Sequence, residues 1–69
     1  MNILFSERLG QLRREKGLTQ LELAKVLNTT QRRISYMESN KVEPDLSTLV
    51  LLSNYFEVST DYLIGIKDY

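Results

Sequence analysis

The stretch that decides the fold is residues 18–41, which read LTQLELAKVLNTTQRRISYMESNK. Thr19 and Glu22 match a capping box, because the threonine hydroxyl can accept from the Glu22 amide while the glutamate reaches back. Thr30 is the better of two N-cap candidates for a second helix, and Asn28 before it suits a left-handed turn. The stretch therefore predicts two short helices joined by a tight turn.

Helical patterns continue on both sides of this stretch. Before it, the apolar spacing predicts one helix over about residues 3–16. After it, Pro44-Asp45 starts a helix, and Ser59 caps a last short helix that Gly65 ends. The buried stripe of the helix after Pro44 is expected to consist of Leu46, Leu49, Leu52, Ser53 and Phe56. No useful period-two alternation occurs, so we expect an all-α fold of five helices in one domain, residues 1–69.

Composition narrows the class of protein. The chain has 69 residues, of which 42% are hydrophobic and 26% charged, so a globular domain with one modest core is expected. It contains no Cys and no His, which argues against a zinc site, and we expect no metal and no cofactor. The apolar run near the N-terminus is too short for a signal peptide or a membrane span. We therefore expect a cytoplasmic protein without membrane contact.

Charge is unevenly distributed along the chain, although its formal net value is zero. Residues 1–41 hold eight Lys and Arg against four Asp and Glu, whereas residues 42–69 hold one against five. The first part could face phosphate groups. An ordinary solvated surface explains the same distribution, so charge alone does not decide whether nucleic acid is a partner.

The second helix of the decisive stretch has one apolar side and one polar side. Four outward positions are of the kind that can reach base edges in the major groove of DNA: Gln31, Arg32, Ser35 and Tyr36. Glutamine suits adenine and arginine suits guanine, each through two hydrogen bonds. From the residues alone, Gln31 and Arg32 could equally be solvated surface, and Tyr36 could simply cover the edge of the core.

Short motifs match one known family in order along nearly the whole chain. They are Arg8-Leu9, Leu12-Arg13, Lys16 to Gln20, Leu23-Ala24, Leu27, Ile34-Ser35, Glu38, the Lys41 to Pro44 spacing, Val58-Ser59 and Asp61 to Gly65. On these motifs the sequence resembles the lambda repressor and Cro family of helix-turn-helix regulators, the xenobiotic-response-element class. The resemblance implies a compact five-helix lambda-repressor-like DNA-binding domain, with its helix-turn-helix at about residues 19–38, that binds operators as a homodimer.

The resemblance also implies roles for individual residues. Gln31 and Arg32 stand where family members contact bases. We expect phosphate contacts from Gln20, Thr30, Arg33, Asn40 and Lys41. Arg13 and Glu38 resemble the family's internal ion pair, which would orient the recognition helix rather than touch DNA.

Departures from the family pattern concern the turns and the surface. Asn28 stands where glycine is usual, a substitution that a left-handed turn tolerates. Apolar residues stand where charged or polar ones are common at Leu21, Val26 and Leu51. Such residues fit either a partner interface or the scattered apolar groups that are normal on protein surfaces.

Dimerisation is expected through the C-terminal part of the chain. One recognition helix reads only a few base pairs, so pairing two half-sites is the usual remedy. The candidate interface residues are Leu51, Tyr55, Val58 and Tyr62. The competing interpretation is that these side chains complete the core of the monomer.

The expected function is that of a sequence-specific DNA-binding transcriptional regulator, a repressor that binds a palindromic operator as a homodimer. Two alternatives stay open: the DNA-binding antitoxin of a toxin–antitoxin pair, and a protein-binding helical adaptor. An enzyme is not expected, because the sequence has no His, no Cys and no glycine-rich phosphate loop.

Overall fold

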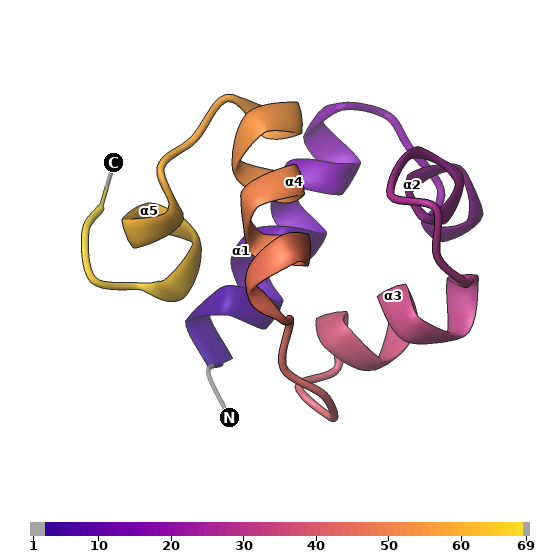
Figure 1. Ribbon diagram of the computed structural model, residues 1–69, viewed down its shortest axis with the longest axis horizontal. Coiled ribbons are helices and arrows are strands. Elements are labelled where there is room, and N and C mark those ends of the chain that lie inside the picture. Colours follow the sequence, from indigo (N-terminus) through magenta and orange to yellow (C-terminus); the bar gives the residue numbers. More distant parts are fainter. Residues whose placement is uncertain (1–2, 69) are drawn as a thin grey trace.

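A computed structural model describes residues 3–68 and contains only helices as regular elements in that range. They are α1 (Ile3–Glu15), α2 (Gln20–Val26), α3 (Gln31–Glu38), α4 (Leu46–Phe56) and α5 (Thr60–Ile64). Helix α1 contacts both α3 and α5, so it connects the helix pair α2–α3 with the C-terminal part of the fold (Figure 1). The predicted all-α fold of five helices is confirmed.

Side-chain caps define the starts of the helices after α1. The Glu22 amide donates to the Thr19 hydroxyl at 3.1 Å, and the Thr19 amide donates to Glu22 Oε1 at 2.8 Å, which completes the predicted capping box. The Thr30 hydroxyl likewise caps α3 by accepting from the third helical amide at 3.1 Å. The remaining caps are Asp45 and Ser59. Each cap satisfies an amide that would otherwise lack a partner at the helix start.

Three non-glycine residues of the described chain adopt the left-handed conformation. Asn28 does so with φ 55°, as predicted, and Asn40 ends the turn after α3 with φ 62°. Asparagine tolerates this conformation because its short side chain can hydrogen-bond locally. Glu57, with φ 56°, ends α4 in the same way, and its residue type predicted no such turn.

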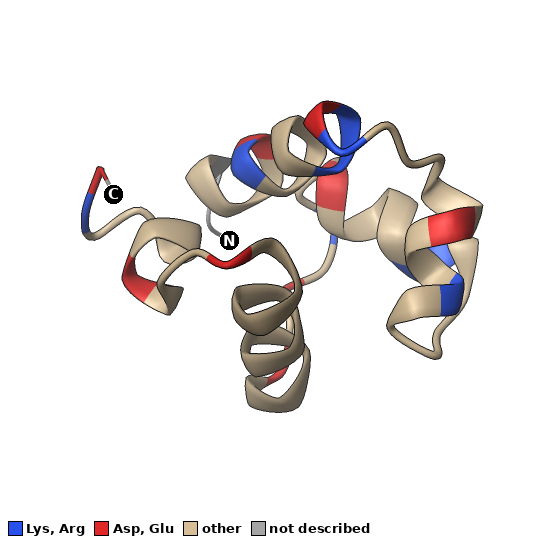
Figure 2. Cartoon of the chain, turned by 90° about the horizontal axis from the view of Figure 1, so that it is seen from above, with Lys and Arg blue, Asp and Glu red and all other residues tan. Residues whose placement is uncertain are grey.

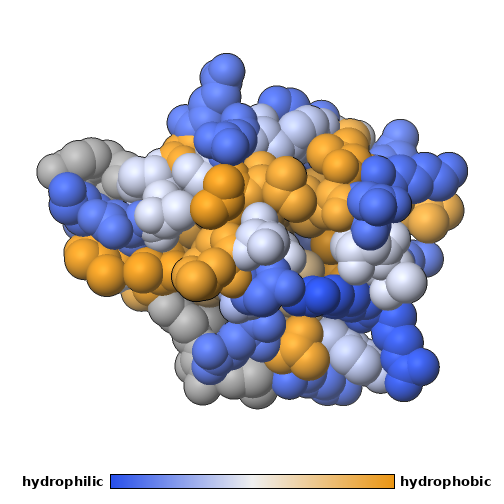
Figure 3. All heavy atoms as spheres, in the orientation of Figure 1, coloured by the Kyte–Doolittle hydropathy of each residue, from blue (hydrophilic) through white to orange (hydrophobic). Residues whose placement is uncertain are grey.

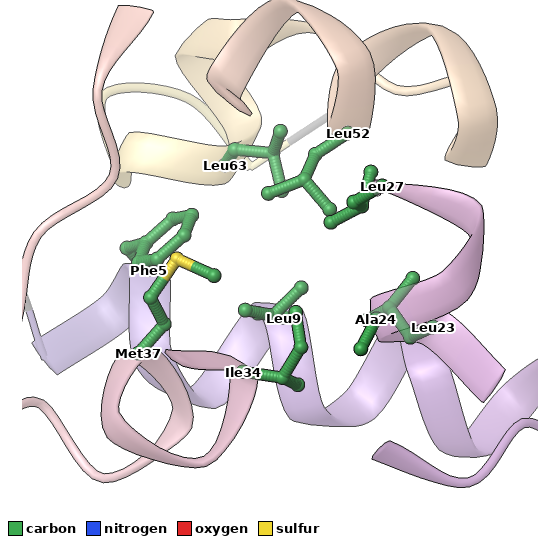
Figure 4. Close-up of a cluster of buried hydrophobic side chains, with 9 residues drawn as sticks. All are labelled: Phe5, Leu9, Leu23, Ala24, Leu27, Ile34, Met37, Leu52 and Leu63. Atoms are coloured by element: carbon green, nitrogen blue, oxygen red, sulfur yellow. The ribbon is translucent and has the colours of Figure 1, made fainter. Parts of the chain in front are cut away.

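Every helix contributes to one hydrophobic core (Figure 4). The nine buried side chains of that core are Phe5, Leu9, Leu23, Ala24, Leu27, Ile34, Met37, Leu52 and Leu63. The side chains of α3 that point into the core, Ile34 and Met37, are fully buried. The core therefore fixes which side of α3 faces outward.

The expected buried stripe of α4 is wrong at Leu46. This side chain is 81% exposed, whereas Leu52 is fully buried and Leu49 and Phe56 are partly buried against the core. At 3.6 residues a turn, Leu46 lies about 90° around the helix from the centre of the face that the other three define. The spacing of three residues from Leu46 to Leu49 and again to Leu52 therefore does not keep Leu46 on the buried side of the helix.

Replacing Gly65 by alanine is expected to cost about 1–3 kcal/mol of stability. Its φ is +86°, and an added Cβ would lie 2.8 Å from Cδ1 and 3.0 Å from Cβ of Leu4. Gly17→Ala is the matched control, because Gly17 has φ +73° but nothing within 4 Å of an added Cβ. Urea unfolding of both variants should show the larger loss for Gly65→Ala. Equal losses would mean that backbone strain, not the contact with Leu4, sets the cost.

Candidate nucleic-acid interface

Helices α2 and α3 pack against each other across a short turn, in which the Thr29 amide donates to the Ala24 carbonyl at 2.9 Å. Leu23 and Ala24 bury the inner side of α2. Helix α3 is held in the core by Ile34 and Met37, so the other side of its N-terminal turns projects into solvent. This is the arrangement through which a helix-turn-helix presents its second helix.

The four residues expected to reach bases share the outward side of α3. Gln31 and Arg32, in its first turn, are exposed, and Ser35 and Tyr36, one turn later, are partly buried. The Arg32 Nε donates to the Tyr36 hydroxyl at 3.0 Å, and the guanidinium carbon lies 5.2 Å from the ring centroid. Their contact with bases stays a prediction, but the structure brings all four onto one surface.

Several of the expected phosphate ligands have partners within the protein. Gln20 Nε2 donates to Glu38 Oε1 at 3.3 Å, and Arg33 Nη2 lies 3.7 Å from Asp45 Oδ2. Lys41 is exposed, and its ammonium lies 5.6 Å from the Tyr36 ring centroid. The remaining two are the α3 cap Thr30, which is exposed, and Asn40, which is partly buried.

Arg33 and Asp45 join the recognition helix to the start of α4. The Asp45 carboxylate accepts from the Thr48 amide at 2.8 Å. Hydrogen bonding from the Thr48 side chain, then from the Thr48 backbone amide, with the Arg33 charge as a smaller cause, lowers the pKa of Asp45 below its ordinary value. Asp45 is therefore ionised at neutral pH and is a charge partner of Arg33 within the protein.

The ion pair between Arg13 and Glu38 is present and nearly buried. Arg13 Nε and Nη2 donate to the two carboxylate oxygens at 2.7 and 3.1 Å, and the side chains are 14% and 10% exposed. Arg13 Nη1 also donates to the Leu18 carbonyl at 2.7 Å. The pair connects α1 with the last turn of α3, and Gln20 extends it to α2. It therefore fixes α3 relative to the two helices that support it.

The loop after α3 adds residues that sequence reasoning missed. Val42 and Glu43 line a shallow hollow of about 280 Å³ together with Thr30, Arg32, Arg33 and Tyr36. The loop is tied to α3 because the Lys41 and Val42 amides both point to the Tyr36 carbonyl, at 2.8 and 3.4 Å. Only the Lys41 to Pro44 spacing in the sequence signalled this segment.

The expected dimer residues divide into two groups. Leu51 is exposed, whereas Tyr55 and Val58 pack partly buried against the core. Tyr62 is partly buried, with the Arg8 guanidinium 4.2 Å from its ring centroid. The monomer therefore uses part of the surface that was assigned to a partner.

Helix α4 carries exposed apolar residues that were not expected. It contains no charged residue (Figure 2), and Leu46 and Val50 are exposed in addition to Leu51. Figure 3 shows hydrophobic residues gathered on the side of the molecule over α4 and α5. Helix α4 therefore presents an exposed surface that is apolar and uncharged.

Residues 3–68 contain no group of three or more acidic side chains placed to hold a metal ion. Within the same range, no helix combines the length and apolar character needed to cross a membrane.

A recognition helix with a free polar N-terminal side, braced by a second helix and a nearly buried ion pair, defines a helix-turn-helix domain of the lambda repressor and Cro type. The helix-turn-helix family model matches residues 9–63, and the chain belongs to this family.

Similar proteins include regulators and repressors. The chain is 44% identical over 61 residues to the SPbeta prophage-derived HTH-type transcriptional regulator YonR of Bacillus subtilis. The matched residues make up 88% of this chain and 56% of YonR. The P22 c2 repressor, solved with a synthetic operator, has a TM-score of 0.86 and 30% identity over 93% of this chain and 97% of that one. The biofilm regulator SinR, solved with DNA, has a TM-score of 0.76 and 30% identity over 86% of this chain and 95% of the SinR chain.

The chain spans about half the length of the curated relatives it matches, with 56% of YonR and 46% of the Bacillus subtilis regulator ImmR covered.

Proposed function

We propose that this protein is a sequence-specific transcriptional repressor that inserts the N-terminal turns of α3 into the major groove of a palindromic operator. The observation that carries the proposal is the outward side of α3. Gln31 and Arg32 are exposed there, while Ile34 on the inner side is fully buried. A helix held in this way offers polar side chains at fixed positions, as direct readout of base edges requires.

Base readout is assigned to Gln31, Arg32, Ser35 and Tyr36. Phosphate contacts are assigned to Gln20, Thr30, Arg33, Asn40 and Lys41, which would set the register of the domain on the duplex. The role of repressor rests on the similarity to the P22 c2 repressor, a protein solved in complex with a synthetic operator.

Selection from a random DNA library, followed by titration of variants, tests the proposal. Gln31→Ala or Arg32→Ala should cost about 1–3 kcal/mol on the selected site and relax the preference at one base pair. Lys41→Ala should weaken binding to all DNA sequences alike and reduce the salt slope by about one unit. Equal, sequence-independent losses for all three variants would show that Gln31 and Arg32 do not read bases.

A homodimer is part of this proposal. The uncharged α4 with exposed Leu51 is a suitable contact for a second copy, and Tyr55, Val58 and Tyr62 would lie at its margin. Two-fold pairing would place the recognition helices about 34 Å apart, so half-sites centred about 10 bp apart should bind most tightly. Operators with altered spacing, together with sedimentation with and without DNA, measure this. A lone half-site that binds as tightly as the full palindrome would contradict the dimer.

The two alternatives predict different results in the same experiments. An antitoxin would bind DNA and also form a stable complex with a toxin encoded beside it. A protein-binding adaptor would select no sequence and show no DNA binding even at low salt, where electrostatic attraction to phosphate is strongest.

A further inference from the structure

The Tyr36 hydroxyl accepts a hydrogen bond from within the protein, from Arg32. Arg32 and Tyr36 are four residues apart on α3 and therefore lie on the same side of the helix. The hydroxyl oxygen accepts from Arg32 Nε at 3.0 Å, and the guanidinium carbon lies 5.2 Å from the ring centroid. The arginine is thus held both by a hydrogen bond and by the face of the ring.

The remaining donors of Arg32 are free in the described part of the chain. A guanidinium has N–H groups on Nε, Nη1 and Nη2, and the hydrogen bond to Tyr36 uses only Nε. Within residues 3–68, Nη1 and Nη2 have no hydrogen-bond partner. These two terminal nitrogens form the pair that can donate in parallel to O6 and N7 of guanine.

Contacts with the loop after α3 and with the core restrain Tyr36, so it can hold Arg32 in place. Its backbone carbonyl accepts from the Lys41 amide at 2.8 Å, and Tyr36 lines the shallow hollow together with Val42. Lys41 places a second cation 5.6 Å from the ring centroid. The neighbouring Met37 is fully buried, so this turn of α3 cannot rotate without disturbing the core.

Arg33 shows the contrasting arrangement. Its guanidinium lies 3.7 Å from the Asp45 carboxylate, so its charge is partly satisfied within the protein. Arg32 has no acidic partner in the described residues. Of the two adjacent arginines, Arg32 is therefore the one whose terminal nitrogens are both oriented and available.

We propose that Tyr36 is a positioning residue for specificity: its hydroxyl holds the Arg32 guanidinium with Nη1 and Nη2 presented end-on to a guanine in the major groove. This inference rests on the proposed function, since it needs α3 in the groove. Preference for guanine at the Arg32 position then depends on the Tyr36 hydroxyl although the hydroxyl itself touches no base, and the base contact assigned to Tyr36 above falls to its ring. A side chain held in advance loses less conformational freedom when it binds.

Tyr36→Phe tests the inference, because it removes the hydroxyl and keeps the ring. We expect about three- to tenfold weaker binding to the selected site, with the melting temperature unchanged. Replacing the guanine by 7-deazaguanine, which lacks the N7 acceptor, should weaken wild-type binding about five- to tenfold and Tyr36→Phe binding clearly less. In an Arg32→Ala background, Tyr36→Phe should change affinity by less than about twofold.

The outcomes separate the inference from the proposed function. If the wild-type protein selects no sequence, the proposed function fails and takes the inference with it. If Arg32→Ala relaxes the guanine preference but Tyr36→Phe does not, the function stands and the positioning role is wrong. If the loss from Tyr36→Phe persists in the Arg32→Ala background, the hydroxyl contacts DNA directly, which also overturns the positioning role.

Discussion

Leu9→Ala is expected to leave the domain largely unfolded at room temperature. Leu9 is fully buried at the centre of α1, among core side chains from all five helices. Removing a buried leucine side chain to alanine costs about 2–5 kcal/mol, because apolar burial is lost and a cavity remains. A domain of this size without disulfide or metal has about 3–5 kcal/mol in total. The helical circular dichroism signal and a urea titration measure the loss.

Leu21→Ala is the matched control for this prediction. It makes the same chemical change on a side chain that is 48% exposed on α2. We expect a change within about 0.5 kcal/mol. If both variants lost the same stability, the contrast between the buried Leu9 and the half-exposed Leu21 would be wrong.

Glu38→Ala is the second change with a large expected effect. It would leave the Arg13 guanidinium nearly buried, with the Leu18 carbonyl as its remaining acceptor, and would also remove the partner of Gln20. Breaking one side of a buried ion pair costs about 3–5 kcal/mol, because an uncompensated charge stays behind. We also expect weaker binding to all DNA sequences, since the last turn of α3 loses its link to α1.

Two further variants sharpen this test. The double variant Arg13→Met, Glu38→Leu should recover most of the stability, because apolar side chains of similar size need no charge partner. Asp61→Ala breaks the exposed pair with Lys67, whose atoms are 3.8 Å apart, and should change the melting temperature little. A Glu38→Ala melting curve like that of Asp61→Ala would mean that the pair between α1 and α3 adds nothing.

The helix starts could be predicted from the sequence because they depend on local chemistry. A cap such as Thr19 or Thr30 bonds to an amide only three residues ahead, so residue type and spacing suffice. The same holds for Asn28, whose left-handed turn depends on its own side chain. The ion pair between Arg13 and Glu38 was predicted on a different basis, because only the resemblance to a known family connected two residues so far apart in the sequence.

The candidate site was predictable in its residues but not in its internal contacts. Gln31 and Arg32 could be placed on an exposed first turn, because the buried positions of α3 follow from its period. The links from Gln20 to Glu38 and from Arg33 to Asp45 could not be predicted. Each joins different helices, so it exists only once those helices have packed.

The sequence by itself determined the five helices, the caps Thr19, Thr30 and Ser59 and the left-handed turn at Asn28, because these depend on bonds and periods within a few residues. The tertiary structure alone decided that Leu46 and Val50 of α4 are exposed and that Tyr55 and Val58 partly complete the monomer core. The physical reason is the geometry of packing. The burial of a side chain at the edge of a helical stripe depends on how neighbouring helices cross over it, and that crossing is a property of the whole core.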